Sequence, residues 1–206
     1  MSEAEFLAAR NVSRETLQQL RAYDALLRRW NGAINLVSKS TLDAVWSRHF
    51  LDSAQLFALA SEGAQIWVDL GSGGGFPGMI AAILSADAGR KTQFTLVESD
   101  VRKAAFLATV SRDLGLGVRV LSERVEALAP LRADILSARA LAPLDKLIEY
   151  AKRHLAPDGV ALFPKGASHA DELKQALDGH HFSYLTAKSL TDPDAVIYQI
   201  RGAPLD

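Results

Sequence analysis

A run of glycines in the first half of the chain carries the clearest chemical signal. Four glycines fall within residues 71–75, directly after one apolar segment and before another. Glycine lets the backbone pass close to a ligand, and the N-terminus of a following helix offers unpaired amide donors. A tight turn alone would not need so many glycines, because each one loses backbone entropy on folding. Residues 69–78 are therefore predicted to hold a nucleotide-like cofactor.

Three common glycine motifs do not fit this segment. A phosphate-binding P-loop needs lysine after its last glycine, where this chain has Met79. The nucleophile elbow of a hydrolase needs glycine two residues before Ser72, where Leu70 stands. A dinucleotide fingerprint that starts at Gly71 needs glycine or alanine at position 76, where Phe76 stands.

The pattern that remains is an acidic residue followed by three alternate glycines. These residues are Asp69, Gly71, Gly73 and Gly75. The pattern resembles the first motif of class I S-adenosylmethionine (SAM)-dependent methyltransferases. That resemblance implies a loop that wraps the methionine part of SAM, with Asp69 ordering the loop and the amino-acid moiety.

A second acidic residue lies at the end of the next predicted strand. Glu98 follows Gly71 by 27 residues, and a carboxylate at that place can accept both ribose hydroxyls of a nucleoside. Enzymes that use NAD have the same feature, so Glu98 alone does not separate the two cofactors. A purely structural alternative is a charge at the start of the helix that begins near Asp100.

The elements that would position these residues alternate between strands and helices after Gly63. Helical spacing predicts three helices before that point: one capped by Ser13 and stopped by Asn31 and Gly32, then residues 40–49 and 52–60. Strands are predicted at 65–70, 92–98, 117–122, 134–138 and 159–164, helices at 76–86, 100–114, 144–155 and 169–177, and a closing antiparallel pair at 182–189 and 195–201. This order predicts an α/β fold, a Rossmann-like doubly wound and mostly parallel sheet of seven strands. We expect an N-terminal helical subdomain, residues 1–62, packed on a methyltransferase domain, residues 63–206.

Composition limits the classes of partner. The 206 residues include no cysteine, and the five histidines show no ligand spacing, so no metal is expected. A net charge of −1 gives no overall attraction to nucleic acid, and RNA binding would need a local basic patch. The acidic N-terminus is not a secretory signal, and no apolar run is long enough to cross a bilayer. We expect a cytoplasmic protein, a monomer without membrane partners.

Further short motifs, spread over nearly the whole chain, narrow the family. They lie at residues 30–31, 35–38, 48–53, 76–78, 98–103, 124–126, 137–140 and 165–166. In their order and spacing the chain resembles the bacterial 16S rRNA (guanine-N7) methyltransferases, also called the glucose-inhibited division protein B family. One departure is Gly74, where many relatives carry proline, and this glycine loosens the loop.

This resemblance implies an activity and a set of site residues. The activity is transfer of a methyl group from SAM to N7 of guanine 527 in 16S rRNA of the small ribosomal subunit, leaving S-adenosylhomocysteine. The implied cofactor site is lined by Gly71, Gly73 and Phe76, with Asp69 ordering the loop, Glu98 on the ribose, Val125 and Glu126 beside the adenine, and Arg139 near both the cofactor and the incoming base. An ordinary strand-to-helix connection is the alternative for Val125 and Glu126.

The chemistry of N7 sets what these residues must do. Guanine N7 has a lone pair and no proton, so its attack on the methyl group needs no general base, and catalysis depends on orientation. Arg139 is the predicted catalytic residue. An arginine bound at N7 would oppose formation of the cationic product, so positive groups are expected at phosphates or at O6 only.

The candidate RNA contacts are basic residues near the predicted carboxyl edge of the sheet: Arg48, His49, Arg102, Lys103 and Lys165. Their alternatives are a helix-capping or packing histidine, a solvated helix face for Arg102 and Lys103, and a plain turn lysine. Competing functions are a methyltransferase acting on a small molecule or protein, a non-enzymatic SAM- or nucleotide-binding module and, more remotely, an NAD enzyme.

Overall fold

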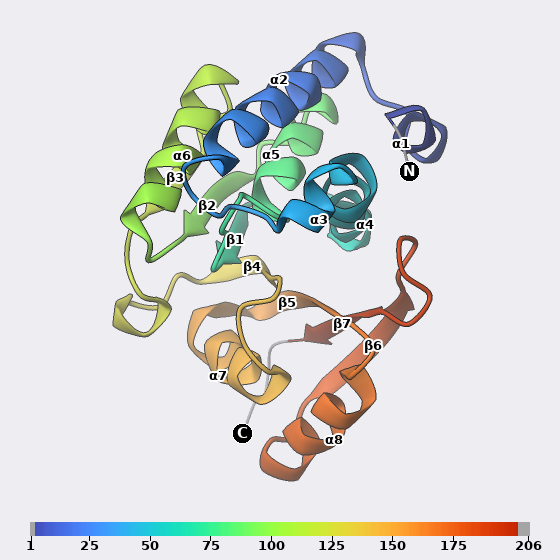
Figure 1. Ribbon diagram of the computed structural model, residues 1–206. Helices are drawn as coiled ribbons and strands as arrows, with labels where there is room; N and C mark the ends of the chain where they lie inside the picture. Colours follow the sequence, from blue (N-terminus) through green and yellow to red (C-terminus); the bar gives the residue numbers. More distant parts are fainter. Residues whose placement is uncertain (1–2, 202–206) are drawn as a thin grey trace.

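The computed structural model describes residues 3–201 as a seven-stranded sheet between two layers of helices (Figure 1). The outer ends of the two predicted domains, residues 1–2 and 202–206, lie outside the described residues. The strands are β1 Ile66–Leu70, β2 Gln93–Val97, β3 Arg119–Leu121, β4 Ala133–Ala138, β5 Leu155–Lys165, β6 Ser183–Lys188 and β7 Val196–Arg201. The helices are α1 Glu3–Ala9, α2 Arg14–Asn31, α3 Lys39–Leu42, α4 Asp52–Leu59, α5 Gly78–Asp87, α6 Val101–Asp113, α7 Leu144–His154 and α8 His169–Gly179.

The strand order confirms the predicted doubly wound sheet with a mixed edge. The order is β3-β2-β1-β4-β5-β7-β6, and the first five strands run parallel. β7 pairs antiparallel with both β5 and β6. The carboxyl ends of β1, β2, β4 and β5 therefore share one edge, which is where open α/β sheets bind ligands.

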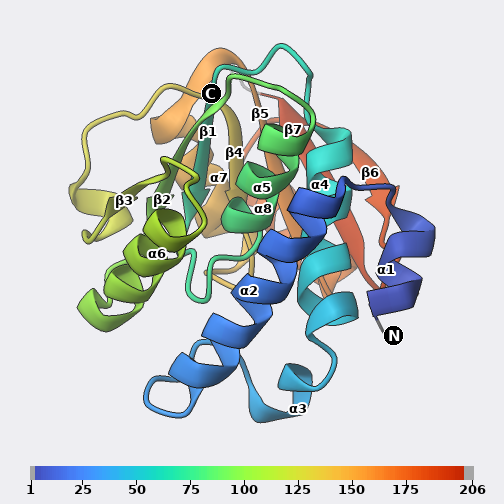
Figure 2. The same ribbon diagram turned by 90° about the horizontal axis from the view of Figure 1, so that it is seen from above.

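Successive side chains of the strands point to opposite faces of the sheet and pack into two separate apolar cores. In β1, Trp67 belongs to the core under α1, α2, α4, α5 and α6, whereas its neighbour Val68 belongs to the core under α7 and α8. Figures 1 and 2 show the two helical layers on opposite faces of the sheet, with α2 crossing over α5 and α6. The N-terminal helices thus bury their apolar faces in the same core as α5 and α6.

The long helix α2 follows the pattern read from the sequence. The Ser13 hydroxyl accepts a hydrogen bond from the Thr16 amide at 3.1 Å, which caps the helix. Leu20, Tyr23 and Leu27, spaced three and four residues apart, are fully buried. The predicted start and end of this helix are confirmed. Helix α1 was not predicted, because its seven residues contain only one buried apolar side chain, Phe6.

The predicted helix at 40–49 is wrong. The helix α3 ends at Leu42, and a π-helical turn, Trp46–Leu51, leads directly into α4. The amide of Asp52 donates to the carbonyl of Ser47, five residues earlier, which is the wider spacing of this turn. Such turns are rare and frequently occur at functional sites.

Candidate active site

Two cavities open at the carboxyl edge of the sheet and share one wall. The loop cavity, of about 450 Å³, lies over the glycine loop. The hairpin cavity, of about 760 Å³, extends from there to α8 and the turn between β6 and β7. The shared wall consists of His49, Arg139, Ala140 and Leu141. Two ligands, one in each cavity, would therefore meet at this wall.

The glycine loop takes a backbone path that other residues adopt only with strain. Gly73 has φ of +56° and Gly75 has φ of +93°. A Cβ at Gly75 would also collide with the hydroxyl group of Tyr23. That hydroxyl donates to the carbonyl of Gly74 at 2.5 Å, so a buried tyrosine from α2 holds the loop from below.

Asp69 lies beneath the loop and does not line either cavity. It is fully buried, and its carboxylate accepts hydrogen bonds from the Ser137 hydroxyl at 2.6 Å and from the Gly78 amide at 3.2 Å. Burial raises the pKa of Asp69 to about 6, even though these hydrogen bonds favour its ionised form. From this position the Asp69 carboxylate holds the end of the loop through the Gly78 amide. It does not reach either cavity, so it would not contact a cofactor bound there.

Glu98 follows the end of β2 and lines the loop cavity. Its Oε2 accepts from the Gly73 amide and its Oε1 from the Asp100 amide, each at 2.8 Å. Both oxygens keep a further lone pair, so the carboxylate is fixed and can still accept two hydroxyl groups. Val125 and Glu126 line the same cavity, where Tyr150 donates a hydrogen bond to Glu126 and lowers the pKa of that carboxyl.

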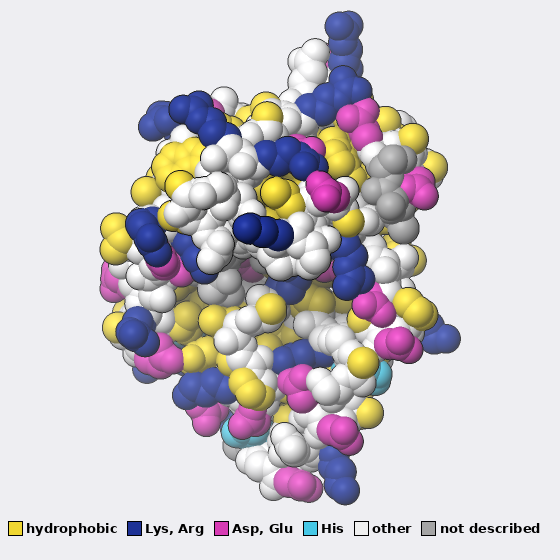
Figure 3. Space-filling model, in the orientation of Figure 1, with side chains coloured by type: hydrophobic (Ala, Val, Ile, Leu, Met, Phe, Trp, Pro, Cys, Tyr) yellow, Lys and Arg dark blue, Asp and Glu magenta, His cyan; other side chains and the backbone are white. Residues whose placement is uncertain are grey.

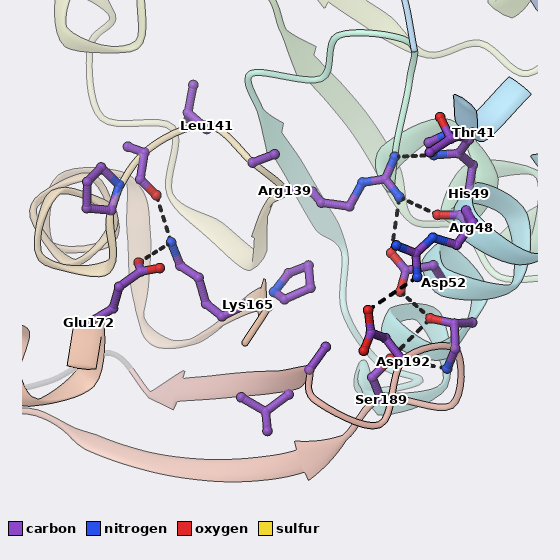
Figure 4. A pocket seen from close by; sticks show the side chains of 18 of the residues that line it. Thr41, Arg48, His49, Asp52, Arg139, Leu141, Lys165, Glu172, Ser189 and Asp192 are labelled. Atoms are coloured by element: carbon purple, nitrogen blue, oxygen red, sulfur yellow. Dashed lines mark hydrogen bonds and ion pairs between the residues drawn. The ribbon is translucent and has the colours of Figure 1, made fainter. Parts of the chain in front are cut away.

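Arg139 follows the end of β4 and stands in the shared wall with its guanidinium fixed on three sides. Nη1 donates to the carbonyl of Arg48 at 3.0 Å and to Asp52 Oδ2 at 3.1 Å, and Nη2 donates to His49 Nδ1 at 2.8 Å. The guanidinium carbon lies 5.2 Å from the ring centre of Phe76. Figure 4 shows Arg139 pointing toward the π-helical turn, across the cavity from Lys165.

His49 is a buried member of the wall, not an exposed cation. Because arginine can only donate, Nδ1 of His49 accepts from Arg139 and Nε2 donates to the Thr41 hydroxyl at 2.9 Å. The ring stacks on Phe76 with centroids 4.8 Å apart. Burial, together with Arg139 and Arg48, lowers the pKa of His49 to about 3. At neutral pH this histidine is uncharged, which suits positioning of Arg139 better than attraction of a phosphate.

Of the four other predicted RNA contacts, three line a cavity and one does not. Arg48 lines the hairpin cavity and pairs with Asp192 at 3.2 Å, and Lys103 lines the loop cavity. Arg102 projects from the first turn of α6 with 72% of its side chain exposed and lines neither cavity. Lys165 is only 9% exposed and lies inside the hairpin cavity.

Sequence reasoning missed the polar residues that enclose the hairpin cavity. Thr191 donates to Asp52 Oδ1 at 2.9 Å, and the amide of Leu190 donates to the side chain of Gln55 at the same distance. Glu172 of α8 also lines this cavity. Nothing in their local sequence marks these residues, because α4, α8 and the turn between β6 and β7 come together only in the folded chain. Among residues 3–201, no group of three or more potential ligands could hold a metal ion, and no helix is long and apolar enough to cross a membrane.

Comparisons of the fold place the chain among methyltransferases. The structure resembles a SAM-dependent methyltransferase from Aquifex aeolicus, with a TM-score of 0.57 and 15% identity over 86% of this chain and 97% of that one. It also resembles a methyltransferase from Geobacter sulfurreducens, with a TM-score of 0.60 and 18% identity over 90% and 89%. At such identities the likeness concerns the fold alone, and it confirms the predicted class I methyltransferase fold.

Comparisons of the sequence are more specific. The family model described as GidB, rRNA small subunit methyltransferase G, matches residues 16–196. The chain is 53% identical over 192 residues to the ribosomal RNA small subunit methyltransferase G of Ruegeria pomeroyi, covering 93% of this chain and 94% of that protein. It is 52% identical to the protein of the same description from Rhodospirillum centenum, covering 95% and 88%. This chain therefore belongs to the rRNA small subunit methyltransferase G family and is a SAM-dependent methyltransferase.

Proposed function

We propose that this chain transfers the methyl group of SAM to N7 of guanine 527 in 16S rRNA. The observation that carries the proposal is the wall shared by the two cavities, at Arg139, Ala140 and Leu141. A cofactor in the loop cavity and a base in the hairpin cavity would face each other there. Such an arrangement converts a reaction between two molecules into one within a single complex.

The loop cavity fits SAM in size and in chemistry. Its volume of about 450 Å³ lies within the range of small-molecule sites. Glu98 accepts the ribose hydroxyls, Val125 and Glu126 flank the adenine, and the backbone of Gly71 and Gly73 borders the methionine part. Bound there, SAM supplies an electrophilic methyl group on a sulfonium centre.

The shared wall provides orientation without a proton acceptor. Among its residues only His49 could accept a proton, and both of its ring nitrogens are already hydrogen-bonded. Guanine N7 carries no proton, so the reaction needs none removed. This matches N7 better than a hydroxyl or amino acceptor, from which a proton has to leave. Arg139, with a side chain held by Arg48, His49 and Asp52, fixes the distance and angle of approach.

Basic side chains around the cavities supply the attraction for RNA. Figure 3 shows a hollow across the middle of this face, bordered by lysine and arginine side chains. Arg48 and Lys103 lie at the two cavities, and Arg102 lies further out on α6. These residues contact phosphates of the rRNA, and such contacts position a protein without reading sequence.

The test uses small ribosomal subunits from cells that lack this protein. Purified protein and SAM with a tritiated methyl group are added, the rRNA is digested to nucleosides, and the label is followed by chromatography. We expect the label in 7-methylguanosine, and cleavage of a second, undigested rRNA sample at 7-methylguanosine by borohydride and aniline, read by primer extension, should place it at guanine 527. Label in another nucleoside, or only in the ribosomal proteins of the subunit, would refute the proposal and favour another acceptor class on the same fold.

A further inference from the structure

A lysine and a glutamate form an ion pair inside the hairpin cavity, away from the shared wall. Lys165 Nζ lies 2.7 Å from Glu172 Oε2, and both side chains line the cavity. Exposed fractions of 9% and 23% show that the pair is largely withdrawn from water. Figure 4 shows the two side chains meeting on the side of the cavity opposite His49.

The pair is held rigidly by its neighbours. The ammonium group also donates to the Ala142 carbonyl at 2.7 Å. Glu172 Oε2 accepts in addition from the Leu144 amide at 3.0 Å, at the start of α7, and Oε1 accepts from the Ser168 hydroxyl at 3.1 Å. Burying a charge pair costs desolvation energy, so a buried ion pair in a cavity wall points to a functional role.

Hydrogen-bonding capacity is left over on both groups. The ammonium group has three protons, and two of them are used, on Ala142 and Glu172. Glu172 Oε1 has two lone pairs and accepts one hydrogen bond. The pair therefore offers a donor beside an acceptor, a few ångströms apart.

We propose that Lys165 and Glu172 read the target base as guanine. Lys165 Nζ donates to O6, and Glu172 Oε1 accepts from the neighbouring N1–H. This inference rests on the proposed function, since it assigns a specificity role at the same acceptor site. It replaces the phosphate contact considered for Lys165 with a contact to the base, at the one guanine oxygen that leaves N7 free.

The position of the pair agrees with a base whose N7 points at the shared wall. O6 lies between N7 and N1 on the edge of guanine. Lys165 is tied to Ala142, which directly follows the wall residue Leu141. A base with O6 on the ammonium group and N1–H on Glu172 therefore has N7 on the side away from Glu172, where Figure 4 shows the wall residues Arg139 and His49.

Adenine would be rejected by the same pair. It carries an amino group in place of O6 and an unprotonated N1, so donor would face donor and acceptor would face acceptor. Unpaired buried polar groups of this kind cost far more than a missing contact.

The carboxylate would also favour the transition state. Positive charge moves from sulfur to the guanine ring during the transfer, and the N1 proton becomes more acidic. A hydrogen bond from N1–H to Glu172 strengthens as this happens, so it stabilises the transition state more than the bound substrate.

The experiment changes the groups on both sides of the proposed contact, the base and the two side chains. Small subunits are reconstituted with 16S rRNA that carries either guanine or 2-aminopurine at the target position. 2-Aminopurine keeps N7 but lacks O6 and the N1 proton. The ratio of kcat/KM for guanine over 2-aminopurine is measured for the wild type, Glu172→Gln and Lys165→Met. Because both acceptors are tested on the same preparation, the fraction of active enzyme cancels.

We expect this ratio to fall at least tenfold in each variant, equivalent to about 1.4 kcal/mol of lost discrimination. Asp171→Asn, which removes an exposed carboxylate from the same helical turn, should keep the wild-type ratio. Ratios unchanged in both variants would overturn the inference and leave the proposed function standing. A wild-type enzyme that modifies no guanine N7 would instead refute the proposed function, and the inference with it.

Discussion

Replacement of His49 by glutamine should remove a distinct part of the acid sensitivity of this protein. The pKa of His49 falls to about 3 in the folded chain because the ring is buried against Phe76 and faces the cationic Arg139. In the unfolded chain the ring titrates at its ordinary value of about 6.5. Below about pH 6.5 the ring therefore binds a proton in the unfolded chain but not in the folded chain.

The size of the effect follows from this difference. A histidine with a lowered pKa contributes stability that is present above pH 6.5 and is lost as the pH falls toward 3. Each pH unit below 6.5 lowers the free energy of unfolding by about 1.4 kcal/mol. Between pH 8 and pH 5 the loss due to His49 is therefore about 2 kcal/mol.

The measurement is the free energy of unfolding in urea at pH 8 and pH 5, for the wild type and His49→Gln. Glutamine retains an acceptor and a donor but does not titrate. We expect the wild type to lose about 2 kcal/mol more than the variant between the two pH values. Other titrating groups, Asp69 and His154 among them, are present in both proteins and cancel in the comparison.

His181→Gln is the matched control, because His181 is exposed in the short segment between α8 and β6. This variant should keep the pH dependence of the wild type. The reasoning fails if His49→Gln and the wild type lose stability equally, within about 0.5 kcal/mol. Such a result would mean that His49 can take up a proton in place, and that Arg139 is not held by a neutral ring.

Four further variants test other parts of the site. Gly73→Asp puts a charged side chain into the loop cavity at a positive φ, and calorimetric titration should find SAM binding abolished while the fold persists. Arg139→Ala should lower methyl transfer on the order of 100-fold while circular dichroism shows a folded protein. Tyr23→Phe leaves the buried carbonyl of Gly74 without its donor, and urea unfolding should show a loss of about 1–3 kcal/mol. Asp69→Asn should remove the stability that the wild type gains as the pH falls through about 6, because a raised carboxyl pKa favours the folded state at low pH and loses that benefit as the pH rises. An unchanged pH profile in this variant would contradict the burial of a charge at Asp69.

The succession of strands and helices and the turns of the glycine loop could be predicted because their signals are local. Glycines at 71–75 mark backbone that must turn with positive φ, and short apolar runs between helical segments mark parallel strands. Most predicted strands agree with the structure to within two residues, as β2 and β7 show. An exception is β5, which starts at Leu155. It continues through a bulge, since Ala133 pairs with Leu155 and Ile135 with Val160.

Features that depend on distant contacts could not be predicted. Lys165 reads as a turn lysine until α8 brings Glu172 to within 2.7 Å. His49 reads as a cation until burial and Arg139 make it a neutral acceptor. The π-helical turn has no signature of its own, because the apolar residues around Trp46 suit an ordinary helix equally well.

The two cavities draw on different parts of the chain. The loop cavity is lined by residues between Leu36 and Tyr150, whereas the hairpin cavity also needs Asp192 and Val196. These last residues come into place only when β7 inserts between β5 and β6. A chain that stops before β7 therefore has every residue that lines the loop cavity but lacks part of the lining of the hairpin cavity. With the roles proposed above for the two cavities, such a chain keeps the lining of the cofactor cavity but has no complete place for a base, which ties methyl transfer to the last strand.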